Sequence, residues 1–187
     1  MKVIVIVGMP GSGKTVFSDI SKKLGIFTLT SGDIIREEVK NRGLVLNEFN
    51  ELKIARWFNR SSNEELIAQR IYEKIKNAEY PSKVVIQGIR SPQAFNELKR
   101  LLKGEKVTLL AIHSLPEIRY KREKERKRYD GKEDKMIKLK DKQQLEHGLG
   151  KLIFMADEKI VNNNSLSKFK KTVKNKLIKI LNIRVKR

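Results

Sequence analysis

The 187-residue chain contains no cysteine, so no disulfide framework can hold it together and nothing in its composition favours secretion. Aromatic residues make up only 6% of it, and they do not interleave with the basic runs as stacking platforms for nucleic acid would. No apolar run reaches the roughly 20 residues that span a bilayer. The first, residues 1–7, leads directly into a glycine-rich turn, unlike a signal peptide. We therefore expect a cytoplasmic protein with no membrane partner.

Acidic residues are missing after Glu158, and this stretch carries about half of the net charge of +20. Its basic residues are Lys159, Lys168, Lys170, Lys171, Lys174, Lys176, Lys179, Arg184, Lys186 and Arg187. Such an excess attracts polyanions. Two interpretations stay open: nucleic acid bound by the basic C-terminal region, or a solvated helix face with an irregular tail. The oligomeric state is not indicated.

Short apolar segments alternate with amphipathic ones along the whole chain. The β-branched residues 2–7 predict a strand buried on both faces. Further strands are predicted at 26–29, 84–86, 107–112 and 159–161, and helices at 14–24, 34–40 (capped by Ser31 or Asp33), 47–60, 63–78, 92–102, from Pro116, up to about Ala156, and along 166–181. This alternation predicts one α/β domain, with a five-stranded, mostly parallel sheet between two helical layers.

Residues 8–15, Gly-Met-Pro-Gly-Ser-Gly-Lys-Thr, match the phosphate-binding P-loop pattern between a buried strand and a helix. Glycines let the backbone curl so that N–H groups point at phosphate oxygens, and the following helix adds its positive end. Lys14 is expected to reach the β- and γ-phosphates, and Thr15 to bind Mg²⁺. We therefore predict ATP and Mg²⁺ as ligands, with the nucleotide held by Gly8, Pro10, Gly11, Ser12, Gly13, Lys14, Thr15 and Val16.

Several classes of P-loop protein are excluded. The chain lacks the Asn-Lys-x-Asp motif with which GTPases bind guanine, and its last predicted strand leads instead into the Asn-Asn-Asn-Ser of residues 162–165. It is also too short for the transporter-type and ring-forming ATPases. Small-molecule kinases remain.

The segment 31–36, Ser-Gly-Asp-Ile-Ile-Arg, resembles the Gly-Asp-x-x-Arg segment of adenylate kinases. Over nearly its whole length the chain is similar to a mostly archaeal, dephospho-CoA-kinase-like group of adenylate-kinase-related proteins. The shared segments are residues 7–15, 32–36, 88–91, 111–114, 119–122, 145–150, 155–157 and 160–162. This resemblance implies a nucleoside-monophosphate-kinase-like P-loop fold, with an acceptor-binding insertion at about 33–80 and a lid at about 117–142. It also implies transfer of the γ-phosphate of ATP to a small phosphorylated acceptor, such as a nucleoside monophosphate.

The resemblance also suggests roles for individual residues. Arg36 would bind the acceptor phosphate, because a guanidinium matches phosphate geometry. Asp33 would hold a Mg²⁺-bound water or accept a hydroxyl proton, unless it only caps a helix. Arg90 follows a strand on the side where ligands bind in such sheets and would also hold the acceptor, the alternative being a surface arginine. Arg56 is a further acceptor contact or an ordinary helix residue.

Arg119, Arg122 and Arg126 share one face of the basic helix. By resemblance they are catalytic lid arginines that close on the γ-phosphate; the alternative is a solvated charged face. Gln87 departs from the pattern, because adenylate kinases have an acidic residue at the end of this strand. A neutral amide cannot anchor a Mg²⁺–water cluster as a carboxylate does. The basic tail, the charges of the lid and Gln87 together motivate a second hypothesis, a nucleotide-regulated nucleic-acid-binding protein with little or no kinase activity.

Overall fold

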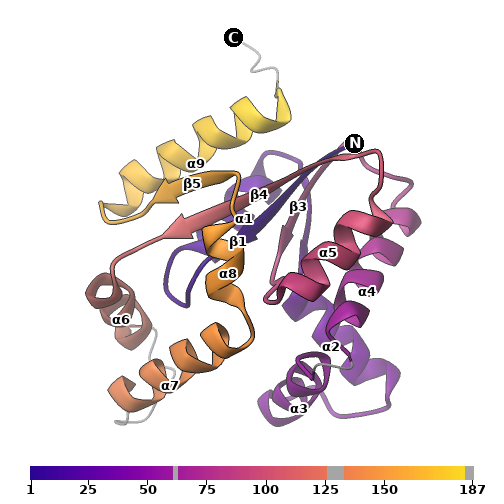
Figure 1. The fold of residues 1–187 in the computed structure, drawn as a ribbon, viewed down its shortest axis with the longest axis horizontal. Coiled ribbons are helices and arrows are strands. Elements are labelled where there is room, and N and C mark those ends of the chain that lie inside the picture. Colours follow the sequence, from indigo (N-terminus) through magenta and orange to yellow (C-terminus); the bar gives the residue numbers. More distant parts are fainter. Residues whose placement is uncertain (61–62, 126–132, 184–187) are drawn as a thin grey trace.

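A computed structural model describes residues 1–60, 63–125 and 133–183, and its centre is a parallel five-stranded sheet (Figure 1). The strands are β1 (Lys2–Val7), β2 (Phe27–Thr30), β3 (Lys83–Gln87), β4 (Lys106–His113) and β5 (Glu158–Val161), in the order β2-β3-β1-β4-β5. All four neighbouring pairs are parallel. Val3 to Val7 of the central strand are almost fully buried, as their β-branched run predicts. The predicted α/β fold is confirmed.

Helices cover both faces of this sheet. They are α1 (Lys14–Lys23), α2 (Ser31–Asn41), α3 (Glu48–Phe58), α4 (Glu64–Asn77), α5 (Pro92–Leu101), α6 (Pro116–Glu125), α7 (Glu133–Glu146), α8 (Leu149–Phe154) and α9 (Leu166–Leu181). Helices α1 and α9 pack on one face, whereas α4, α5 and α8 contribute to the core on the other. The α2–α3 and α6–α7 pairs lie apart from each other, beyond the sheet (Figure 1). They therefore flank the edge at which the strands end.

The last helix, α9, belongs to the core despite its many lysines. Its buried residues, Phe169, Val173, Leu177 and Leu181, follow a helical period and join one cluster with strand residues of β1 and β4. Lys176 of α9 donates a hydrogen bond of 2.6 Å to Glu158 of β5. Helix α9 is thus a structural element of the domain.

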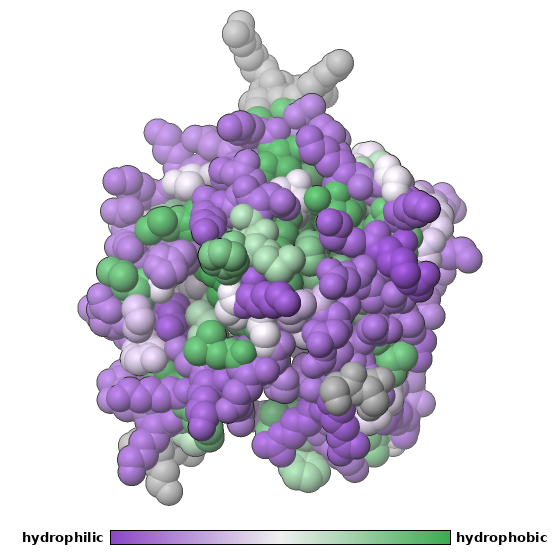
Figure 2. Space-filling view, in the orientation of Figure 1, coloured by the Kyte–Doolittle hydropathy of each residue, from purple (hydrophilic) through white to green (hydrophobic). Residues whose placement is uncertain are grey.

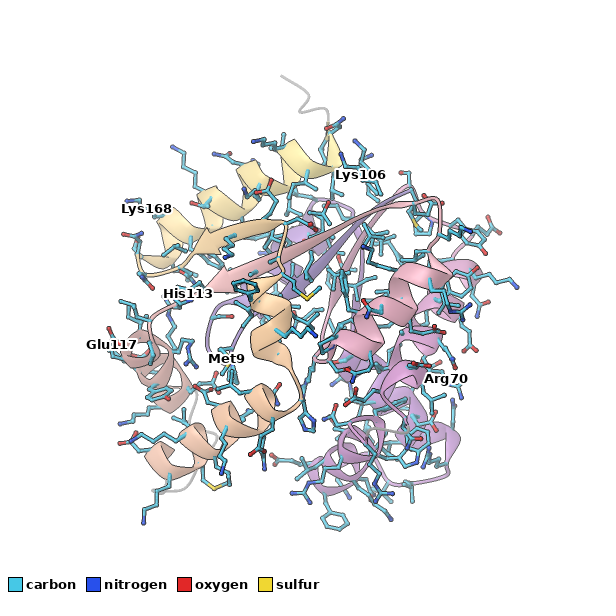
Figure 3. All side chains as sticks on the ribbon, in the orientation of Figure 1. Met9, Arg70, Lys106, His113, Glu117 and Lys168 are labelled. Atoms are coloured by element: carbon cyan, nitrogen blue, oxygen red, sulfur yellow. The ribbon has the colours of Figure 1, made fainter. Side chains whose placement is uncertain are left out.

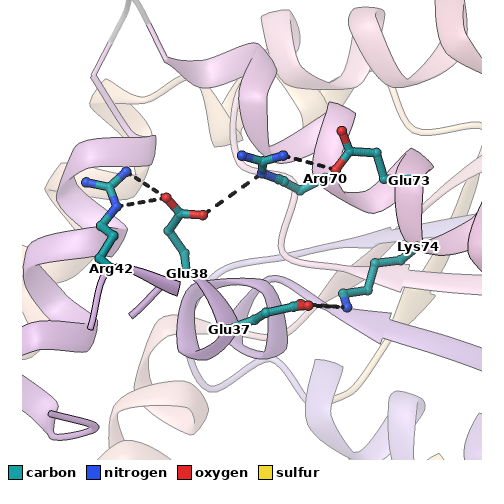
Figure 4. Close-up of polar contacts among 6 residues, drawn as sticks. All are labelled: Glu37, Glu38, Arg42, Arg70, Glu73 and Lys74. Carbon is teal, nitrogen blue, oxygen red and sulfur yellow. Dashed lines mark hydrogen bonds and ion pairs between the residues drawn. The ribbon is translucent and has the colours of Figure 1, made fainter. Parts of the chain in front are cut away.

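Ion pairs connect α2 to α4 (Figure 4). Lys74 lies 2.6 Å from Glu37, and Arg70 approaches Glu38 at 4.0 Å. Glu38 also pairs with Arg42 at 2.8 Å. These contacts hold together the two helices between which α3 and its neighbouring loops are inserted.

Two local expectations are wrong. Helix α2 is capped by neither Ser31 nor Asp33: the hydroxyl of Thr30 accepts a hydrogen bond of 3.2 Å from the Asp33 amide, so the helix begins earlier. The helix expected to reach Ala156 is two helices, α7 and α8, separated at Gly148. That glycine has a φ of 86°, and a Cβ there would lie 2.7 Å from Cδ of Pro92. Close packing against α5 therefore requires the break.

The surface is strongly polar, as a 34% content of charged residues predicts. Figure 2 shows a largely hydrophilic face, with hydrophobic side chains gathered mainly near its middle. Among the helices of the described residues, none combines the length and the apolar character that crossing a membrane requires.

Candidate functional site: two adjoining clefts

The phosphate loop connects β1 to α1, and its glycines are required by their surroundings. Gly11 and Gly13 have φ values of 75° and 110°, which favour glycine. A Cβ on Gly13 would lie 2.6 Å from the side-chain nitrogen of Asn162, and one on Gly11 would lie 2.7 Å from the Arg119 carbonyl oxygen. Neighbouring segments therefore hold the loop on its outer side.

A cleft of about 750 Å³, open to solvent, lies along this loop, and we call it the phosphate cleft. Its lining includes Gly8, Pro10, Gly11, Gly13, Lys14 and Thr15. The Lys14 ammonium donates to the carbonyl oxygens of Gly8, at 2.6 Å, and Met9, at 3.1 Å, so it lies folded over the loop. Met9 and His113, the last residue of β4, are labelled in Figure 3. The arrangement suits an anion that would draw the ammonium away from the carbonyls.

Ser12 gives independent support for an anion in this loop. Its side-chain oxygen is buried and has no hydrogen-bond partner among the described residues. A buried hydroxyl without a partner is costly. A phosphate oxygen against the loop would accept a hydrogen bond from this hydroxyl, so the loop fits a nucleotide phosphate.

The two described lid arginines contact the outside of the loop. Arg119 donates to the carbonyl oxygen of Pro10 at 3.0 Å and forms a buried ion pair with Asp141 of α7 at 2.7 Å. Arg122 approaches the Gly11 carbonyl oxygen at 3.4 Å. Neither residue lines the phosphate cleft. In this structure both brace the loop, and the third expected arginine, Arg126, lies outside the described residues.

Asn162 is a residue that sequence reasoning missed as part of the site. It follows β5, its side chain is buried, and its amide donates to the Ser12 carbonyl oxygen at 2.8 Å. Its own carbonyl oxygen accepts from Ser114 at 2.7 Å and Arg122 at 3.0 Å. Three residues of α6 and α7 that also line the phosphate cleft were missed as well: Glu123, Lys140 and Gln144. These three residues form no recognisable sequence motif, because they come from two helices that meet only in the folded protein.

A second cleft, which we call the acceptor cleft, adjoins the phosphate cleft. Its lining includes Thr15 and Gln87 together with three predicted acceptor residues: Asp33, Arg36 and Arg90. Arg36 is engaged, since it donates to Asp33 at 2.6 Å and pairs with Glu51 at 3.7 Å. Burial would raise the pKa of Asp33, but hydrogen bonds from Thr30 and Arg36 outweigh it and lower that pKa below its ordinary value. Asp33 is thus an anion at neutral pH, held by its own helix.

Arg90 occupies the junction of these spaces. It lines the phosphate cleft, the acceptor cleft and a third pocket behind them. It forms no hydrogen bond or ion pair with any residue in the described part of the chain, and burial lowers the pKa of its guanidinium. A partly buried cation without a partner favours an anionic ligand.

The third pocket has apolar walls and is partly open to solvent. Its lining includes Phe58 of α3, Glu64 of α4 and His147 from the turn between α7 and α8. The ring of Trp57 meets that of Phe58 edge-on, with centroids 4.9 Å apart. The pocket thus receives residues from the acceptor-binding helices and from the turn that follows α7.

The other predicted residues are placed less centrally. Arg56 is exposed on α3 and lines none of the three spaces, and Val16 is half-buried in α1. Thr15 is exposed to both clefts, so its hydroxyl can bind a cation beside the phosphates. No group of three acidic or histidine side chains that could hold a metal occurs within residues 1–60, 63–125 and 133–183. The side-chain oxygen of Gln87 accepts a 2.6 Å hydrogen bond from the Ser18 hydroxyl.

Comparison with known proteins shows the family and the fold of this chain. A family model described as an AAA domain matches residues 7–140. A UPF0200 protein of Pyrococcus abyssi is 36% identical over 184 residues, covering 96% of this chain and 97% of its own. The shikimate kinase of Acinetobacter baumannii, solved with shikimate, has a TM-score of 0.58 at 18% identity, over 100% of this chain and 96% of its own. For the dephospho-CoA kinase of Campylobacter jejuni the TM-score is 0.57 at 16% identity, with coverages of 96% and 97%. The two kinases share the fold.

Proposed function

The chain belongs to the UPF0200 family, which confirms the expected archaeal P-loop kinase-like family, and we propose that it is an ATP-dependent phosphotransferase. It would move the γ-phosphoryl group of ATP to a small phosphorylated acceptor of the nucleoside monophosphate kind. A bond forms between an acceptor phosphate oxygen and the γ-phosphorus, while the bond from that phosphorus to the bridging oxygen of ADP breaks. The acceptor oxygen is anionic near neutral pH, so the step needs no dedicated base.

The observation that carries this proposal is the position of Arg90. Phosphoryl transfer depends mainly on positioning and on cations around the migrating group. Arg90 is an unpaired guanidinium, within the described chain, at the place where the phosphate cleft opens into the acceptor cleft. It can therefore hold two anionic groups near each other, which would otherwise repel.

Other residues support the two sides of the reaction. Lys14 and Ser12 would bind the phosphates of ATP, with the amides of the loop. Bound Mg²⁺, held by Thr15 and the phosphates, would neutralise charge that develops during transfer. Arg36 would bind the acceptor phosphate after leaving Asp33 and Glu51, which is the role expected from its similarity to adenylate kinases. The Gln87 amide supplies no charge, so Asp33 is the carboxylate that would orient water around the cation.

The lid is also part of this proposal. The ion pair of Arg119 and Asp141 joins α6 to α7, while Lys140 and Gln144 of α7 line the phosphate cleft. We expect this pair of helices to cover the bound triphosphate and exclude water. Within one P-loop kinase domain, the insertion at about 33–80 would supply walls of the acceptor cleft and of the third pocket.

The test is a panel of nucleoside monophosphates, dephospho-CoA and small sugars, each incubated with ATP and Mg²⁺ while ADP is measured. We expect ADP formation that depends on one acceptor and is abolished in Lys14→Ala. Arg90→Ala should raise the KM for the acceptor, because the unpaired cation is lost. The matched control is Arg56→Ala, which removes an exposed arginine that lines none of the three spaces. Absence of acceptor-dependent ADP across the panel would refute the proposal.

The second candidate, a nucleotide-regulated nucleic-acid-binding protein, is favoured by one observation. Helix α9 exposes a row of lysines with no acidic residue in the helix: Lys168, Lys170, Lys171, Lys174 and Lys179. Removal of α9 would expose the core, so substitution is the appropriate test. Replacing Lys170, Lys171 and Lys174 by glutamine should weaken RNA or DNA binding and flatten its salt dependence. Unchanged binding would exclude α9 as the interface.

A further inference from the structure

The third pocket contains a carboxylate oxygen that has no hydrogen-bond donor in the described part of the chain. Glu64 is the first residue of α4 and lines this pocket. Its Oε2 atom is buried and has no hydrogen-bond partner among the described residues. A buried carboxylate oxygen without a donor is costly, and native proteins rarely keep one without a reason. The missing donor can come from a ligand.

Helix stabilisation alone does not account for this burial. Acidic side chains in the first turn of a helix are favourable, and α4 has two, Glu64 and Glu65. Glu65 is exposed. Glu64 would gain as much from the same position on the surface. Its burial in the pocket therefore needs another cause.

The remaining walls of the pocket indicate what kind of group would lie there. Ile35, Phe58 and Ile67 provide apolar surfaces, and the ring of Phe58 can contact a flat ligand face. The pocket is joined to the acceptor cleft through Arg90, which lines both. A ligand with its phosphate at Arg90 can thus place an attached ring between apolar walls, with the edge of the ring toward Glu64.

We propose that Glu64 selects an acceptor whose ring carries an exocyclic amino group. A carboxylate is an acceptor only, so it binds an N–H donor and repels a keto oxygen at the same position. The ligand class is therefore a nucleoside monophosphate with an aminated base, adenine, cytosine or guanine, in preference to uracil or hypoxanthine. This inference rests on the proposed function and adds the specificity of the same site.

The experiment compares pairs of nucleoside monophosphates whose bases differ at one position. AMP and IMP, and likewise CMP and UMP, differ by an amino group in place of a keto oxygen. Their dissociation constants are measured calorimetrically on the full chain, with a non-hydrolysable ATP analogue present. We expect at least one aminated member to bind about tenfold or more tightly than its keto partner, since hydrogen bonds to charged groups contribute strongly and mismatches leave the carboxylate unpaired.

The variants separate recognition from folding. In Glu64→Gln the amide can turn its NH₂ group toward a keto oxygen, so the preference should fall to about threefold or less. Glu65→Gln removes the same charge from the next residue and should keep the full preference. Melting temperatures are recorded for both, and if Glu64→Gln does not fold, the wild-type comparison decides alone.

The outcomes distinguish this inference from its premise. Tight but equal binding of the aminated and keto members overturns the role of Glu64 and leaves the phosphotransferase proposal intact. A preference that survives in Glu64→Gln also overturns it. If no monophosphate binds at all, the nucleotide acceptor is wrong, and the selection by Glu64 is rejected with it.

Discussion

Replacing Asn162 by alanine should affect both the stability of the fold and the binding of nucleotide. Asn162 is 4% exposed, and its side-chain amide donates to the Ser12 carbonyl oxygen at 2.8 Å. In Asn162→Ala the buried carbonyl oxygen of Ser12 loses this hydrogen-bond donor, which costs about 1–3 kcal/mol of stability. In a protein of this size each kcal/mol lowers the melting temperature by about 2–4 °C. We therefore expect a decrease of about 2–12 °C.

The same change should weaken ATP binding, although Asn162 does not line the phosphate cleft. A P-loop binds phosphate because its amides point inward and its carbonyls outward, and Asn162 fixes one of those carbonyls. If the lost free energy is what keeps the loop in its binding conformation, the Kd for Mg-ATP rises about 5- to 150-fold. Scanning calorimetry gives the first quantity and isothermal titration calorimetry the second.

Asn163→Ala is the matched control for this prediction. Asn163 accepts an exposed hydrogen bond of 3.0 Å from the Leu115 amide, which water can replace. Its loss should change the free energy of unfolding by less than about 0.5 kcal/mol and leave ATP binding unaltered. A less stable Asn162→Ala protein with unchanged ATP affinity would refute the idea that this residue orients the loop.

Three further predictions concern stability. Asp141→Asn leaves a buried guanidinium without its counter-ion and should lower the free energy of unfolding by about 3 kcal/mol or more, measured by urea denaturation; an unchanged midpoint would contradict this. Gly88→Ala places a Cβ 2.0 Å from the Ser31 hydroxyl at a φ of 111°, so it should cost more than about 1 kcal/mol in thermal unfolding. Lys176→Met should lose less than about 1 kcal/mol near neutral pH. The Lys176 hydrogen bond lowers the pKa of Glu158 below its ordinary 4.5, so this loss should disappear in acid, where Glu158 is protonated; a loss that persists there would argue against it.

The strands and the phosphate loop could be predicted because their signals are local. A β-branched run such as Val3 to Val7 is typical of a strand buried on both faces, and glycines before Lys14 impose one backbone path. The N-cap of α2 was misplaced because Thr30, Ser31 and Asp33 are all good capping residues. The choice among them depends on where β2 ends, which is set by its pairing with β3.

The candidate site was only partly predictable, because much of it is assembled from distant segments. Arg119 and Arg122 were expected to face the phosphates, but the structure directs them to the carbonyls of the loop, and Asp141 compensates the first of them. The sequence cannot show this, since Asp141 is one acid in a charge-dense helix. Glu64 was likewise hidden among the ordinary acids of a helix start.

The position of Trp57 has a practical consequence for all of these measurements. It is the single tryptophan of the chain, and its ring contacts Phe58, which lines the third pocket. The Arg42 guanidinium lies 4.1 Å from the centroid of the Trp57 ring. Indole emission responds to nearby charge and to solvent. The unlabelled protein therefore contains its own fluorophore beside the pocket, and an acceptor titration can be followed by the light that one side chain emits.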